Sequence, residues 1–88
     1  MTFRVTLSET AARQLRKLPP DIRSRIAKGL RVLEDDPLRS RPRADIRSIK
    51  GTDPRKYRLR IGHYRAVYAV VEDEVKVIEV FVRGRGYR

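Results

Sequence analysis

The sequence has no cysteine, one histidine and one methionine among its 88 residues. Without cysteine, the chain can form neither disulfide bonds nor thiolate metal sites. A single histidine also excludes a histidine-cluster metal site. Both of these kinds of metal site are therefore excluded, and we expect the protein to use no cofactor.

Long apolar runs are absent as well. No stretch approaches membrane-spanning length, and the N-terminus has no apolar signal-peptide core. A chain of this size buries only about two thirds of its unfolded surface, which is enough for one modest core. We expect residues 1–88 to form a single domain in the cytoplasm, with no membrane partner.

Acidic residues are scarce relative to basic ones. Lysine and arginine total 22 against 11 acidic residues, the net charge is +11, and 17 of the 22 basic residues are arginine. Such a balance indicates a polyanionic partner, most often nucleic acid, and guanidinium groups bind phosphate bidentately and stack on bases. Charge alone also fits a plain basic surface, a simple RNA-binding module or a membrane-surface binder.

The N-terminal half predicts one strand and two helices. Residues 3–7 alternate apolar and polar, and Ser8 is a favourable cap for a helix that follows. The Pro19-Pro20 pair ends that helix and begins a second one. The second helix presents one apolar stripe, made of Ile22, Ile26, Leu30 and Leu33. Residues 38–56 are expected to be a polar connection anchored by Ile46 and Ile49.

Three strands are predicted in the C-terminal half, at residues 57–61, 64–71 and 75–82. Gly62-His63 is a two-residue hairpin signal, and a polar residue such as His63 is ordinary at the tip of a turn. The predicted fold is α+β: an N-terminal strand, a two-helix hairpin and then a three-stranded antiparallel meander, with the helices packed on one face of the sheet.

The Gly62-His63 turn fixes the register of the first hairpin. It places Arg58, Arg60 and Arg65 on one face, and the opposite face, which the helices cover, receives Tyr57, Leu59, Ile61, Tyr64, Ala66 and Tyr68.

The second turn, near residues 72–74, allows two interpretations. A two-residue turn moves Arg83 to the helix side, whereas a three-residue turn at 72–74 puts it beside the other arginines. We favour the three-residue turn because it places Ile78, Val80 and Val82 in the core, with Lys76 near the end of that side; the arginine side then receives Val75, Val77, Glu79, Phe81 and Arg83.

The predicted cluster of Arg58, Arg60, Arg65 and Arg83 adds nothing to folding, because like charges repel. An anionic ligand explains the cluster more easily. The alternative is that single arginines pair with Glu79 and acidic loop residues, or reach into solvent.

With these motifs the sequence resembles the RelE/ParE superfamily of bacterial and archaeal toxins, and specifically the compact archaeal type of its RelE branch. The resemblance covers essentially the whole chain. It is carried by "LPPDIRSRI" at 18–26, "KGTDPRKYRLRIGHYRAVYAV" at 50–70 and "RGRGY" at 83–87.

The resemblance implies a ribosome-dependent endoribonuclease that cleaves mRNA in the A site. The ribose 2′-OH attacks the adjacent 3′-phosphate, without a metal, and translation stops. By the same resemblance, Arg65 and Arg83 lie at the scissile phosphate, Arg58 and Arg60 hold the backbone, and Tyr87 stacks on a codon base. Arg85, Lys50 and Arg88 are implied as further RNA contacts. Arginine at 58 and 60, where some relatives have lysine, implies catalysis by positioning and charge stabilisation, or by a group from the ribosome.

The implied partners are the ribosome, mRNA and a RelB-type antitoxin that blocks the toxin. We expect the antitoxin to cover an apolar area at the end of the arginine side, formed by Val67, Val71, Val75, Val77 and Phe81. Two other functions remain open: a ParE-like toxin that binds DNA gyrase without nuclease activity, and a plain RNA- or DNA-binding module.

Overall fold

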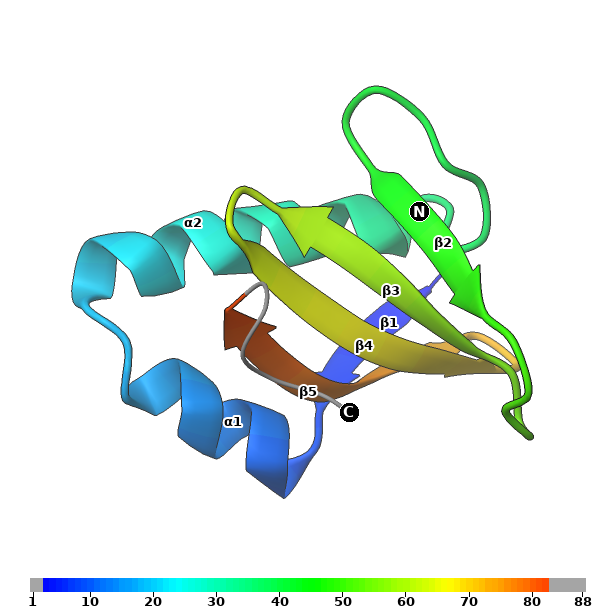
Figure 1. Ribbon diagram of the computed structural model, residues 1–88, viewed down its shortest axis with the longest axis horizontal. Coiled ribbons are helices and arrows are strands. Elements are labelled where there is room, and N and C mark those ends of the chain that lie inside the picture. Colours follow the sequence, from blue (N-terminus) through cyan, green and yellow to red (C-terminus); the bar gives the residue numbers. More distant parts are fainter. Residues whose placement is uncertain (1–2, 83–88) are drawn as a thin grey trace.

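The computed structural model describes residues 3–82, which form two helices packed on one face of a five-stranded sheet (Figure 1). The strands lie in the order β1-β5-β4-β3-β2, in which β1 is parallel to β5 and the other pairs are antiparallel. The predicted α+β fold is confirmed. In chain order the elements are β1 (Arg4–Leu7), α1 (Glu9–Arg16), α2 (Pro20–Leu30), the 3-10 helix η1 (Arg31–Glu34), β2 (Asp45–Ile49), β3 (Lys56–Ile61), β4 (Tyr64–Val71) and β5 (Glu74–Val82). In the described part of the chain, no helix is long and apolar enough to cross a membrane.

Both helices begin where local sequence signals place them. The Ser8 hydroxyl accepts a hydrogen bond from the backbone N–H of Ala11 at 3.0 Å, which satisfies one of the free donors of the first turn of α1. Pro20 opens α2 at a position where a missing N–H costs nothing. The helices therefore start at fixed points relative to the strands.

The core lies between the helices and the facing side of the sheet. Ile26 of α2 and Leu33 of η1 are completely buried, as the apolar stripe predicts. Tyr68 of β4 is also completely buried, and its ring stacks on Tyr57 with a centroid separation of 5.6 Å. These tyrosines pack in the core on the helix side, as predicted. The other buried members of the core include Ala11, Leu15, Leu30, Ala44, Ile46, Leu59, Ala66, Val75, Val77 and Val80.

Strand β2 corrects the predicted polar connection at 38–56. Asp45–Ile49 pairs antiparallel with β3, so the meander has four strands. Only Ile46 in this strand is buried, opposite Leu59, while Arg47 and Ser48 are exposed. A polar edge strand of this kind forms through backbone pairing with its neighbour, and its own sequence gives no alternating apolar pattern.

The predicted three-residue turn at 72–74 is wrong. Val71 pairs with Glu74, so the turn consists of Glu72 and Asp73, with Glu72 at φ 56° in the left-handed region. This turn puts Val75 and Val77 on the core side and Lys76 on the arginine side, opposite to the prediction.

A β-bulge at Ile78 then restores the predicted register. Tyr68 pairs with Val77 but Val67 pairs with Glu79, so Ile78 is the extra residue of β5. Beyond the bulge, Val80 faces the core opposite Ala66, and Phe81 lies opposite Arg65 on the other face, as predicted. The bulge therefore reverses the error of the turn for the end of the strand.

Helix α1 holds the bulged edge of β5 where β1 stops. The last pair between β1 and β5 is Leu7 with Val77. Beyond it, the Ser8 hydroxyl donates to the Ile78 carbonyl at 2.7 Å, and the Val80 N–H donates to the Gln14 side-chain carbonyl at 2.6 Å. Two side chains thus supply the hydrogen-bond partners that a neighbouring strand would otherwise provide along this part of β5.

The connection from η1 to β2 is fixed by side chains that bind its backbone. The Arg41 guanidinium donates to the carbonyls of Val32, Asp36 and Arg39 at 2.9, 2.9 and 2.7 Å. The Asp36 carboxylate accepts from the N–H groups of Leu38 and Arg39 at 3.0 and 3.3 Å. The bond from Leu38 in particular holds the pKa of Asp36 below its usual range. An ordered connection therefore leads into β2.

The hydroxyl of Tyr68 ties this connection to the core, and its removal tests the tie. It donates to the Pro37 carbonyl at 2.6 Å in a buried position. We predict that Tyr68→Phe lowers the free energy of unfolding by about 1–3 kcal/mol, because the carbonyl loses its buried partner. Tyr64→Phe is the matched control, since among residues 3–82 no hydrogen bond involves the Tyr64 hydroxyl. Urea unfolding of the two variants measures the difference, and equal losses in both would contradict the assignment.

The same variant has a predicted alkaline signature. Burial raises the pKa of Tyr68 above its ordinary value. The unfolded chain releases this proton near pH ~10 while the folded chain keeps it, so folding loses stability as the pH rises beyond that point. Tyr68→Phe should lack this part of the alkaline loss.

Candidate active site

The register of the sheet gathers charged side chains from three strands on the face opposite the helices. Arg60 of β3 lies opposite Arg65 of β4 on one side and opposite Asp45 of β2 on the other. Arg58 lies opposite Arg47 of β2, one row further along the sheet. Neighbouring strands are only about 4.8 Å apart, so these side chains share one small area.

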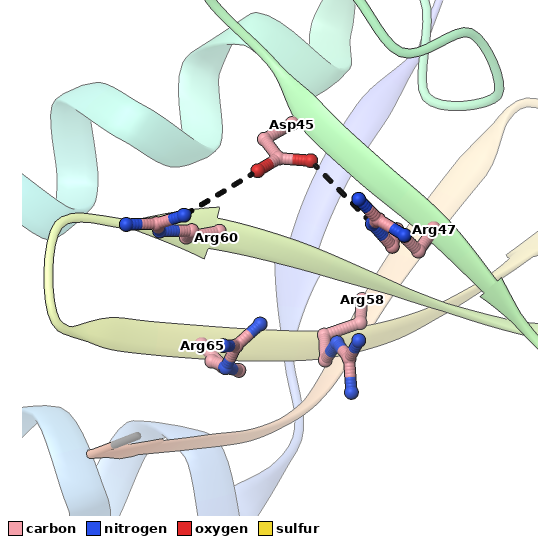
Figure 2. Close-up of a pocket in the computed structure, with 5 residues that line it drawn as sticks. All are labelled: Asp45, Arg47, Arg58, Arg60 and Arg65. Atoms are coloured by element: carbon pink, nitrogen blue, oxygen red, sulfur yellow. Dashed lines mark ion pairs between the residues drawn. The ribbon is translucent and has the colours of Figure 1, made fainter.

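These five residues line a pocket of about 150 Å³, which we call the arginine pocket: Asp45, Arg47, Arg58, Arg60 and Arg65. Figure 2 shows the Asp45 carboxylate between Arg60 and Arg47, with Arg58 and Arg65 on the far side of the pocket. Arg58 and Arg65 are half-buried, whereas the side chains of Arg47 and Arg60 are 73% and 51% exposed. Rigid strands therefore present the cations to solvent.

The pocket is strongly electropositive. Four guanidinium groups and one carboxylate carry a net formal charge of +3. The carboxylate lies 4.0 Å from Arg47 Nε and 4.0 Å from Arg60 Nη1, distances at which attraction is weak near solvent. The Arg58 side chain makes no hydrogen bond or ion pair among the described residues, although its backbone is paired within the sheet. Mutual repulsion among these groups is relieved when an anion such as phosphate binds.

Of the eight predicted site residues, the structure brings Arg58, Arg60 and Arg65 into one pocket. Lys50 is exposed at the end of β2, beyond the Ile49–Lys56 pair, and does not line the pocket. The predicted site residues Arg83, Arg85, Tyr87 and Arg88 lie outside the described residues.

Two lining residues escaped the sequence analysis, Asp45 and Arg47. Both belong to β2, which was expected to be a connection. The signal was present in Asp45-Ile46-Arg47, where one apolar residue separates two charged ones, but it was too short to predict a strand.

Glu79 does not neutralise the pocket. It lies opposite Val67 on the arginine side of the sheet, and it takes part in no ion pair among residues 3–82. The alternative that Glu79 pairs with the predicted arginines therefore finds no support in this part of the chain.

The predicted apolar area on this side needs correction. Val75 and Val77 are in the core, and Val67 is only 1% exposed. Val71 is 55% exposed and Phe81 is half-buried. Little uncovered apolar surface therefore remains from the predicted set.

Neither the histidine nor a cluster of metal-ligating side chains adds to this pocket in the described residues. His63 is exposed in the turn between β3 and β4 and does not line the pocket. Residues 3–82 contain no group of three histidine, cysteine, aspartate or glutamate side chains suited to hold a metal ion. The arginine pocket is thus the part of the described chain with the clearest capacity to act on a phosphate.

Comparison with known proteins gives consistent results. The profile of the family described as "ParE toxin of type II toxin-antitoxin system, parDE" matches residues 5–87. The chain is 30% identical over 87 residues to a protein of Methanocaldococcus jannaschii that is named as a candidate toxin, RelE1. The match covers 98% of this chain and 94% of that relative.

Solved structures with the same fold include two toxin–antitoxin complexes. The archaeal RelE–RelB complex from Pyrococcus horikoshii OT3 matches with a TM-score of 0.80 and 30% identity, over 98% of this chain and 100% of that chain. The RelBE2 complex from Mycobacterium tuberculosis matches with a TM-score of 0.77 and 25% identity, over 94% and 100% of the two chains.

The electropositive pocket predicts a measurable contribution to RNA binding. Each lost phosphate contact should reduce the slope of log affinity against log salt by about 0.7 for single-stranded RNA. We expect this reduction for Arg58→Ala and for Arg47→Ala, and none for Arg25→Ala, which removes an exposed arginine from α2. Titration of a fluorescent RNA oligonucleotide at several salt concentrations measures the slopes. Equal effects of all three substitutions would show that overall charge, and not the pocket, governs binding.

Proposed function

Because the chain belongs to the ParE toxin family of type II toxin–antitoxin systems, within the RelE/ParE superfamily, we propose that it is a RelE-type toxin that cleaves messenger RNA in the ribosomal A site. The observation that carries this proposal is the arginine pocket, in which Arg58, Arg60 and Arg65, predicted from the sequence to share one face, lie together. A toxin that acts only by binding a protein surface has no need for four arginines around one small cavity.

The proposed reaction is attack of a ribose 2′-OH on its own 3′-phosphate. The phosphorus becomes pentavalent and gains negative charge in the transition state, and cations fixed on strands stabilise it without reorganisation. Arg65 and Arg83 are proposed to contact the scissile phosphate. Arg58 and Arg60, together with Arg47, are proposed to bind the phosphates of the RNA backbone on either side of the cleaved bond.

Binding of the codon is proposed to use the remaining predicted residues. Tyr87 stacks on a base, because aromatic rings bind any unpaired base through its π-face. Arg85, Lys50 and Arg88 contribute positive charge that attracts the phosphates of the mRNA. Cleavage takes place in the cytoplasm, where ribosomes translate.

A RelB-type antitoxin is the proposed protein partner. Complexes of RelE and RelB are among the solved structures that this chain resembles, including the intact Escherichia coli RelBE complex, at 28% identity and a TM-score of 0.63. A ParE-like action on DNA gyrase is the second candidate, because the family is described by its ParE member.

Substitution of the phosphate-contacting arginines tests the nuclease. We predict that Arg65→Ala and Arg83→Ala each lower mRNA cleavage about 10²–10³-fold and relieve growth arrest in cells, since each removes one contact to the transition state. Primer extension on mRNA from a translating extract measures the cuts. Arg25→Ala on α2 is the control and should cleave normally.

The same experiment separates the two candidate functions. Cuts within A-site codons support the nuclease. Intact mRNA together with inhibited gyrase, or full toxicity of both arginine variants, would overturn it in favour of the ParE-like action.

A further inference from the structure

Among the described residues that line the arginine pocket, one side chain can accept a proton. A guanidinium group carries N–H donors and no acceptor, so Arg47, Arg58, Arg60 and Arg65 only donate hydrogen bonds. Asp45 is the single carboxylate among the lining residues. Attack by a 2′-OH releases a proton from that hydroxyl, and within the described lining of the pocket Asp45 alone can receive it.

The Asp45 carboxylate is free to contact a substrate. Its two oxygens lie 4.0 Å from Arg47 Nε and from Arg60 Nη1, which is beyond hydrogen-bonding distance. No described residue donates a hydrogen bond to it, and its side chain is 45% exposed. Its acceptor positions are therefore open, and the two guanidinium groups at 4.0 Å attract it only weakly.

The position of Asp45 also suits the geometry of the attack. It lies in one cross-strand row with Arg60 and Arg65, on the outer strand β2. In Figure 2 the carboxylate points into the pocket from the β2 side, across from Arg58 and Arg65. A phosphate held between Arg58 and Arg65 would have one flank next to Asp45, within reach of a ribose 2′-OH on that side.

We propose that Asp45 is the general base of the cleavage, an inference that rests on the proposed nuclease function. The 2′-oxygen forms a bond to phosphorus as its proton passes to an Asp45 oxygen. The bond between phosphorus and the 5′-oxygen breaks, and that oxygen takes a proton from water. Asp45 returns its proton to solvent, so the products are a 2′,3′-cyclic phosphate and a free 5′-OH with no net change in protons.

A purely structural role for Asp45 makes a different prediction. As a counter-ion, it would only hold Arg47 and Arg60 in place, and its loss would lower the rate by the same factor at every pH. As a general base, it is replaced by hydroxide in a variant, and hydroxide rises about tenfold per pH unit. The pH dependence therefore distinguishes the two roles.

The test uses Asp45→Asn, which keeps the shape of the side chain and removes the proton acceptor. We expect single-turnover cleavage of ribosome-bound mRNA at saturating protein to fall about 10²-fold, the low end of the range for general-base catalysis. RNA affinity should be retained or increased, because the substitution removes a negative charge. The difference in cleavage rate between the wild-type protein and Asp45→Asn should become smaller as the pH rises. Asp45→Glu, which restores the carboxylate, should recover part of the rate.

Glu79→Gln is the matched control. It makes the same change of charge on the same side of the sheet, away from the lining of the pocket, and should cleave normally. If Asp45→Asn cleaves at the wild-type rate, or if its deficit is constant with pH, the general-base role is excluded. If the wild-type protein itself leaves ribosome-bound mRNA intact, the nuclease proposal fails, a result separate from a failure of Asp45 alone.

Discussion

The bulge at Ile78 is the constraint on which the division of this sheet into two chemical faces depends. Without it, the two-residue turn at Glu72-Asp73 would carry one register along all of β5, and Val80 would leave the core. With it, Val75, Val77 and Val80 all face the helices. The bulge is held from outside the sheet, by the hydroxyl of Ser8 and the amide of Gln14. Helix α1 is therefore both a lid on the core and a support for the edge of β5.

A sheet fixed in this way can carry repelling charges. The helix side buries the apolar side chains that stabilise the fold, whereas the arginine pocket gathers like charges that repel one another. Because Arg58, Arg60 and Arg65 stand on central strands, their backbone positions are fixed by pairing on both edges. Cations attached to a fixed backbone lose less freedom when a phosphate binds than cations on a loose segment, which favours electrostatic stabilisation of the transition state.

The inner arginines were predictable from the sequence because one local signal determines their register. Gly62 adopts φ 59°, and the two-residue turn that it permits sets Arg60 opposite Arg65 without reference to the rest of the chain. The second turn lacked such a signal. Glu72 adopts a left-handed backbone conformation there, and glutamate rarely does so, so its presence did not predict the turn. The bulge is held by Ser8 and Gln14, which lie more than sixty residues away in the sequence. The pattern of apolar and polar residues within β5 therefore does not predict it. Turn and bulge cancel, and the prediction for Phe81 was correct although its reasoning was incomplete.

Strand β2 had the largest effect on the chemistry of the site. The sequence predicted a cluster made only of arginines, which can stabilise a phosphate but cannot accept the proton of an attacking hydroxyl. The carboxylate comes from a strand with a single buried residue, Ile46, whose existence depends on the exposed edge of β3. Since the pattern within a polar edge strand is weak, a sequence reading tends to miss such a strand, and with it the side chains that it adds to a site. In this chain the residue added in that way is Asp45, the carboxylate among the described residues that line the pocket.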